Sequence, residues 1–92
     1  MTTKLWVTMT DNFLSGWGQA RGKTNKLVLE CESNEEANIV EQNARNRSEM
    51  KYVNICARKP SYNARHYLTS WHDKTDYDSW YKPGYFKRED RR

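Results

Sequence analysis

One capped helix lies between segments that alternate hydrophobic and polar residues, and this order constrains the fold more than any other feature. Ser33 and Glu36 have the spacing of a capping box, in which the serine hydroxyl accepts from the amide of residue 36 and the glutamate reaches back. A narrow apolar stripe follows, made of Ala37, Val40 and Ala44. The pattern predicts a helix from Ser33 to about Ser48 that packs closely on a sheet.

Three segments have the two-residue period of half-buried strands, namely residues 4–10, 26–31 and 52–58. The element order is therefore β-β-α-β. A right-handed crossover that brings the third strand beside the first predicts the sheet order 2-1-3 with antiparallel neighbours. Residues 65–71 add a candidate fourth strand. We expect an α+β fold with a three- or four-stranded antiparallel sheet, one helix on one face and an aromatic-rich C-terminal extension.

Length and composition place these elements in one domain. The chain has 92 residues, of which 36% are hydrophobic and 30% charged, so the core must be small. We expect a β-β-α-β core over residues 1–60, an aromatic and basic extension over 61–86 that packs on it, and a flexible charged tail over 87–92. The extension or a partner is expected to cover the sheet face opposite the helix. The chain lacks an apolar run long enough for a bilayer and a signal-peptide stretch, which predicts a cytosolic protein without membrane contact.

Basic charge and aromatic residues occur together towards both ends of the chain. Residues 1–29 carry a net charge of +3, residues 30–49 carry −4 and residues 50–92 carry +5, which gives the chain its net +4. Trp, Tyr and Arg dominate protein-binding hot spots, and aromatic rings with cationic rims also bind single-stranded nucleic acid. The predicted partner-binding residues are Trp17, Arg21, Lys23, Arg58, Lys59, Tyr62, Arg65, Trp71, Trp80, Tyr81, Lys82 and Tyr85.

The loop over residues 11–25 is long for a connection between two strands, and such loops are usually functional. Its end, Gly22-Lys23-Thr24, matches the last part of a phosphate-binding P-loop. Trp17 occupies the position of the first glycine of that motif, however, and a strand is expected to follow instead of a helix. The loop is therefore either a flexible basic segment or a basic binding element with Trp17 as its anchor, and its length favours the binding role.

Residue types that carry catalysis or bind metal lack the required spacing. Cys31 and Cys56 lie in predicted strands, form no zinc-binding pattern and are expected to be free thiols. No nucleophile motif is present. We expect no catalytic residue, no metal and no cofactor; a small hydrolase or transferase is the minor alternative.

Four segments, TDNFLSGWG, NKLVLEC, MKYVNI and WYKPGYF, make up residues 10–18, 25–31, 50–55 and 80–86. With them the chain resembles small accessory proteins encoded by tailed bacteriophages, and the resemblance covers most of its length. It implies a protein that acts in the cytoplasm of a bacterial host. Such proteins bind host machinery or block host defence, anti-CRISPR proteins among them. The leading prediction is a non-catalytic protein that binds and inhibits or redirects a host protein or nucleoprotein complex. The alternative is direct binding of single-stranded DNA or RNA.

Overall fold

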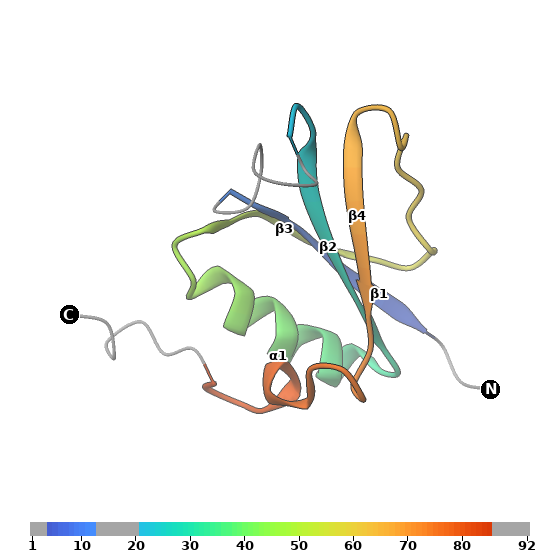
Figure 1. Ribbon diagram of the computed structural model, residues 1–92. Coiled ribbons are helices and arrows are strands. Elements are labelled where there is room, and N and C mark those ends of the chain that lie inside the picture. The colour runs from blue at the N-terminus through green and yellow to red at the C-terminus, as the bar shows by residue number, and fades with distance from the viewer. Residues whose placement is uncertain (1–3, 13–20, 86–92) are drawn as a thin grey trace.

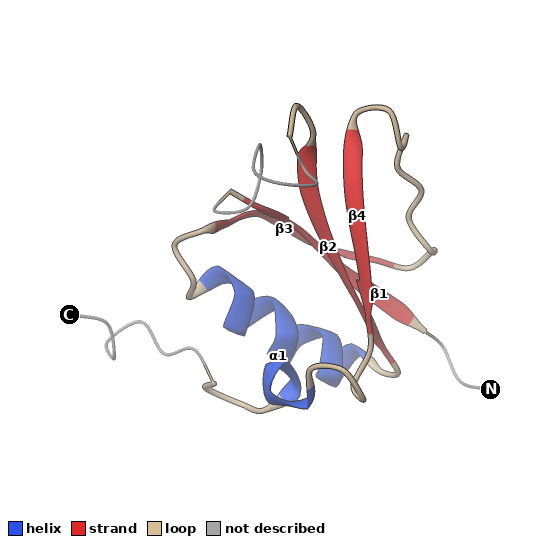
Figure 2. Ribbon diagram, viewed as in Figure 1, coloured by secondary structure: helices blue, strands red, loops and turns tan. Residues whose placement is uncertain are grey.

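The computed structural model describes residues 4–12 and 21–85 and shows an α+β arrangement, a four-stranded mixed sheet with one α-helix against one face (Figure 1, Figure 2). The elements are β1 (Leu5–Asp11), β2 (Thr24–Cys31), α1 (Asn34–Arg45), β3 (Met50–Cys56), β4 (Tyr67–His72) and the short 3-10 helix η2 (Asp78–Tyr81). Trp17, with most of the loop predicted to bind a partner, and the predicted flexible tail over 87–92 lie outside the described residues. Within the described ranges, no helix is long and apolar enough to cross a membrane.

The strand order is β3-β1-β2-β4, and β1 pairs antiparallel with both β2 and β3. The predicted 2-1-3 arrangement of the first three strands is therefore confirmed. The prediction of a fully antiparallel sheet is wrong, because β4 pairs with β2 in parallel, from Thr24 opposite Tyr67 to Leu29 opposite His72. The reason lies in the β3–β4 loop, residues 57–66. It crosses from one edge of the sheet to the other and returns to the starting end, so β4 runs in the same direction as β3 and β2 (Figure 1).

Helix α1 begins at the predicted capping pair, but the second bond differs from that of a capping box, because Glu36 accepts from the residue before the N-cap. The Ser33 hydroxyl accepts from the Glu36 amide at 3.1 Å, and the Glu36 carboxylate accepts from the Glu32 amide at 2.9 Å. The helix ends at Arg45, three residues before the predicted end at Ser48, with Asn46 as its C-cap. The apolar stripe of Ala37, Val40 and Ala44 is fully buried, so the small side chains let the helix lie close to the sheet.

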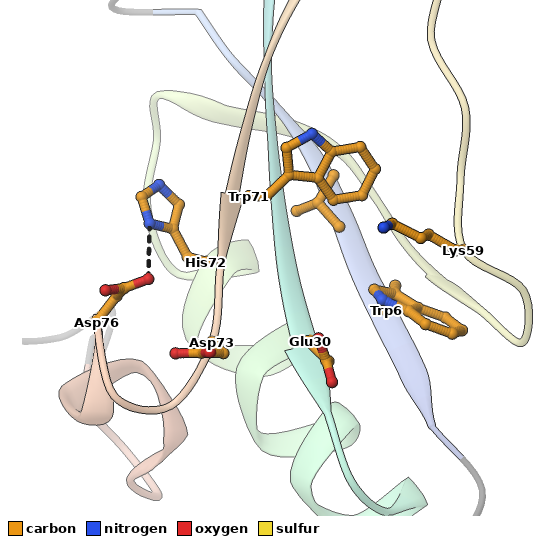
Figure 3. A pocket seen from close by; sticks show the side chains of 8 residues that line it. Trp6, Glu30, Lys59, Trp71, His72, Asp73 and Asp76 are labelled. Atoms are coloured by element: carbon orange, nitrogen blue, oxygen red, sulfur yellow. Dashed lines mark ion pairs between the residues drawn. The ribbon is translucent and has the colours of Figure 1, made fainter.

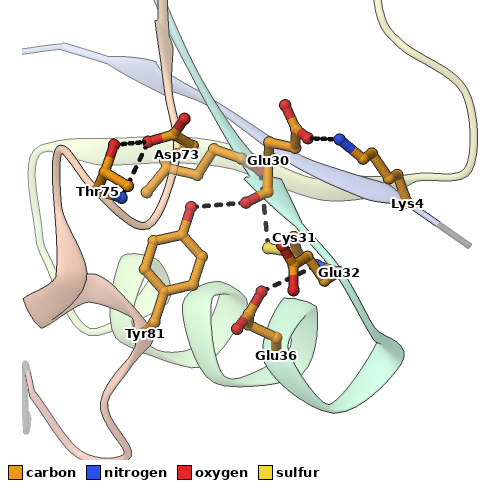
Figure 4. Close-up of polar contacts among 9 residues, drawn as sticks. Lys4, Glu30, Cys31, Glu32, Glu36, Asp73, Thr75 and Tyr81 are labelled. Carbon is orange, nitrogen blue, oxygen red and sulfur yellow. Dashed lines mark hydrogen bonds and ion pairs between the residues drawn. The ribbon is translucent and has the colours of Figure 1, made fainter. Parts of the chain in front are cut away.

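The core fills the space between α1 and the sheet. Its strand residues include Leu5, Val7, Met9, Leu27, Leu29, Cys31 and Val53. Trp80 and Tyr81 of η2 complete it, with 6% and 8% of their surface exposed. The Tyr81 hydroxyl donates to the Glu30 carbonyl at 2.8 Å (Figure 4). Since the alanine stripe of α1 is narrow, η2 supplies the large rings that close the core beside it.

Candidate functional site

The sheet face opposite α1 carries most of the partly exposed aromatic and basic side chains, and we call it the loop face because the β3–β4 loop lies against it. Strand alternation places on it Trp6, Thr8, Thr10, Lys26, Val28, Glu30, Asn54, Cys56, Tyr67, Thr69 and Trp71. Its centre is covered, since Thr8 and Val28 are buried. Tyr62 of the loop hydrogen-bonds the Thr8 side chain, and burial nevertheless raises the pKa of its phenol. The expected covering of this face by the C-terminal part of the chain therefore involves Tyr62 and β4.

Lys26 lies among three tyrosine rings at the basic end of the loop face. Its Nζ is 5.9 Å from the ring centroid of Tyr52, 5.6 Å from that of Tyr62 and 5.8 Å from that of Tyr67. The ammonium donates to the Thr10 hydroxyl at 2.7 Å, and burial lowers the pKa of Lys26. The rings of Tyr62 and Tyr67 also contact each other, with centroids 5.4 Å apart. The result is a half-buried cation within an aromatic cluster, a combination that attracts anionic, planar groups.

Tyr52 extends this cluster to the surface through an irregular backbone. The pairing of β1 with β3 shifts register between Thr8 and Thr10, so β3 carries an extra residue there. Tyr52 has a φ of 56°, in the left-handed region that disfavours side chains other than those of glycine and asparagine. The tyrosine is nevertheless 74% exposed, so burial does not compensate for its backbone conformation. A strained and exposed aromatic residue is a feature of binding sites.

The other end of the loop face is acidic and contains a small pocket of about 140 Å³. Its lining is Trp6, Val28, Glu30, Lys59, Trp71, His72, Asp73 and Asp76 (Figure 3). The Lys59 ammonium lies over the Trp71 ring, 5.1 Å from its centroid. His72 Nδ1 and an Asp76 carboxylate oxygen are 3.7 Å apart. The face therefore changes from basic to acidic along its length, with indole rings at the acidic end.

A larger groove of about 390 Å³ runs between β4 and the β3–β4 loop. It is lined by Lys23, Pro60, Ser61, Tyr62, Ala64, Tyr67, Leu68, Thr69 and Trp71. Its volume lies within the range of roughly 300–1,000 Å³ that is typical of small-molecule sites. Three aromatic rings and one ammonium group line the groove, so its walls match the composition of the neighbouring cluster around Lys26.

The structure brings together only some of the predicted partner-binding residues. Lys23, Lys59, Tyr62 and Trp71 gather on the loop face and its groove. Three further cations, Arg21, Arg58 and Arg65, are exposed in turns and loops. On the other side of the sheet, Lys82 and Tyr85 are exposed after η2.

Trp80 and Tyr81 occupy the core, which corrects their assignment to the partner surface. Sequence reasoning missed Lys26 and Tyr52 as site residues. Lys26 and Tyr52 occupy polar positions in strands that alternate polar and apolar residues, and this pattern could have indicated that both are on the surface. No sequence pattern indicates the bulge that turns Tyr52 outward.

Six basic residues of the loop face and its adjoining turns have no carboxylate partner within ranges 4–12 and 21–85. They are Lys23, Lys26, Lys51, Arg58, Lys59 and Arg65, and among the described residues the structure shows no ion pair for any of them. By contrast, Lys4 pairs with Glu30 at the acidic end (Figure 4), and Lys74 pairs with Glu36 of α1. The basic end of the loop face therefore has positive charge available for an external anion.

Both cysteines are free, as expected, and the structure separates their reactivities. Cys31 is fully buried, and desolvation raises the pKa of its thiol to about 12. Cys56 is only partly buried. Across residues 4–12 and 21–85, no group of three or more His, Cys, Asp or Glu side chains could hold a metal ion.

We expect a thiol-specific alkylating reagent to modify Cys56 in the native protein and to leave Cys31 unmodified. Because the thiolate is the reactive form, the raised pKa alone slows Cys31 on the order of a thousand-fold. Mass spectrometry should find one adduct per chain under native conditions and two in denaturant. Rapid double modification of the native protein would contradict the buried position of Cys31.

The loop face thus combines an aromatic cluster, unpaired cations and a groove on one side of a small sheet. These are features of a binding surface, and the chemistry of the side chains indicates the class of ligand.

No family model matches this chain, and neither the curated proteins nor the solved structures contain a significant match to it.

Proposed function

We propose that this chain is a non-catalytic binding protein whose loop face binds single-stranded nucleic acid. The observation that carries the proposal is the position of Lys26 within the rings of Tyr52, Tyr62 and Tyr67. Aromatic side chains stack on unpaired bases, while cations at their rim neutralise phosphates. Sheet faces with exposed aromatic residues are a recurring platform for single strands.

The positions of the cations along the loop face favour nucleic acid over an acidic protein surface as the ligand. The cations of this face come from separate parts of the chain, Lys23 before β2, Lys26 within it and Lys59 after β3. Lys26 lies among the tyrosine rings, Lys23 lines the groove and Lys59 lies over the Trp71 ring at the acidic end. None of the three has a carboxylate partner in the described part of the chain, so each is available to a phosphate while the rings contact the bases.

The test is the salt dependence of binding to a random 12-nucleotide single strand, measured by fluorescence anisotropy. For a single strand, log K falls with log salt with a slope of about −0.7 for each phosphate that is neutralised. Three to four contacts predict a slope of roughly −2 to −3. Lys26→Met should weaken binding about fivefold and reduce the slope by roughly 0.7, because it removes one phosphate contact.

Lys82→Met is the matched control, since it removes the same charge from an exposed position after η2, away from the loop face. We expect it to leave the affinity within a factor of two. Lys26→Met should also keep its melting temperature, because desolvation already opposes the charged form of Lys26. No detectable binding at low salt, or equal losses in the two variants, would refute the proposal.

A second candidate is a host nucleoprotein complex, which the protein would bind and inhibit or redirect, as its resemblance to phage accessory proteins implies. The acidic pocket with Glu30, Asp73 and Asp76 supports this candidate. It lies on the same face as the basic cluster, so one surface offers complementary charge to a nucleic acid and to a basic protein. Capture from bacterial lysate with and without nuclease separates the two, because a protein contact survives nuclease and a purely nucleic-acid contact does not.

A further inference from the structure

The groove beside β4 exposes backbone hydrogen-bonding groups as well as rings. β4 is an edge strand, and its register with β2 is fixed by the Thr24 amide, which donates to the His66 carbonyl at 3.0 Å. In a parallel pair with this register, residues 68, 70 and 72 direct their backbone groups towards β2. The N–H and C=O groups of Thr69 and Trp71 therefore point outward. Both residues line the groove, and no described residue is shown bonding these groups.

A turn closes one end of the groove, and this limits the length of a ligand that the groove can hold. The Asn63 carbonyl accepts from the Tyr67 amide at 2.9 Å and from the His66 amide at 3.0 Å. This turn closes the groove beside the start of β4 and uses the first outward amide of the strand. Only the outward groups of Thr69 and Trp71 remain, too few for a regular added strand. A compact planar group with its own donor and acceptor fits this arrangement better than an extended peptide.

We propose that this groove is a base-reading subsite, which takes one unstacked base of the single strand. The inference rests on the proposed function and adds selectivity to it. The base would lie against the rings of Tyr62 and Trp71, and its hydrogen-bonding edge would meet the backbone N–H and C=O of Thr69. Lys23 at the groove wall would contact the adjoining phosphate. Once a bound base covers these polar groups, one base edge pairs with them and another leaves them unpaired, so the affinity depends on the base.

The first experiment uses the unmodified protein and four probes of equal length: dT12, dA12, dC12 and an abasic dodecamer. We expect the tightest of the three homopolymers to bind at least tenfold more strongly than the abasic strand, and the three to differ at least threefold among themselves. The Thr69 amide proton, which bonds no backbone group of the described residues, should become protected from hydrogen exchange in the complex with the tightest probe. The abasic strand should leave it exposed.

The second experiment replaces Thr69 with proline. Proline removes only the outward N–H at this position, so the ladder with β2 persists and an edge strand tolerates the change. Thr69→Pro should lose about fivefold in affinity for the tightest probe and most of the difference between bases, while the salt slope stays unchanged. Thr69→Ala keeps the N–H and is the matched control.

The outcomes separate this inference from the proposed function. Salt-dependent binding with equal affinity for all bases, or an exchanging Thr69 amide in the complex, overturns the subsite and leaves the loop face as a single-strand binding surface. Absence of binding to every strand overturns both. Protection of the Thr69 amide by a soluble extended peptide and not by any strand would assign the groove to a peptide and also overturn the subsite. Hydrogen exchange needs no variant, so the test holds even if Thr69→Pro does not fold.

Discussion

Asn43→Asp is expected to destabilise the protein by about 4 kcal/mol at pH 7, because it removes the donors that attach η2 to α1. Asn43 is 1% exposed, and its side-chain amide donates to the carbonyls of Trp80 and Lys82, both at 2.8 Å. The substitution keeps the shape of the side chain. It replaces two donor hydrogens with an oxygen that faces two carbonyl oxygens in a buried place. The expected fall in melting temperature is roughly 20 °C.

The pH dependence of the stability of Asn43→Asp shows whether the loss comes from the buried charge or from a change in side-chain shape. Burial beside two carbonyls raises the pKa of a carboxyl at position 43 above its unfolded value. The penalty is therefore small below the unfolded pKa and grows as the pH rises through it. We expect Asn43→Asp to differ from the unmodified protein much less at pH 4 than at pH 7 in denaturant titrations. A loss that is the same at both pH values would contradict this account.

Asn38→Asp is the matched control, because it makes the same change on the exposed side of the same helix. Its stability should stay within about 0.5 kcal/mol of that of the unmodified protein. If both variants were equally destabilised, the cause would be the charge on α1 and not the contact between Asn43 and η2.

The local elements of this fold follow from local patterns, and for that reason they could be predicted. The capping pair Ser33 and Glu36 locates the start of α1, and period-two alternation locates the first three strands. Their order 2-1-3 is one of the arrangements that a right-handed crossover allows, and the structure adopts it. The direction of β4 depends instead on the path of the β3–β4 loop, which has no periodicity, so the parallel pairing could not be deduced.

The division of the aromatic residues between core and surface was only partly predictable. Trp80 and Tyr81 lie in a polar segment, and two bonds from Asn43, 37 and 39 residues away along the chain, attach this segment to α1. Composition cannot reveal such a distant polar contact. Lys59, Tyr62 and Trp71 do gather on one face, because β4 and the preceding loop place them beside β2.

Tyr52→Gly is expected to weaken binding to the single strand about 30-fold and, at the same time, to stabilise the protein. The loss of affinity follows from removal of a ring that is 74% exposed beside Lys26. The gain in stability follows from the φ of 56°, which glycine adopts without steric cost. We expect a net gain of about 0.5–1 kcal/mol, or roughly 4 °C in melting temperature, since the exposed ring contributes little to packing.

Two further variants at this position separate the ring from the backbone. Tyr52→Phe keeps both the ring and the strained backbone, so affinity and melting temperature should remain near those of the unmodified protein. Tyr52→Ala removes the ring and keeps the strain, so it should bind as weakly as Tyr52→Gly without the gain in stability. If Tyr52→Gly bound normally, the strained tyrosine would have no role in binding. A binding role explains why a strained position carries an exposed ring, since the packing of this ring does not offset the strain.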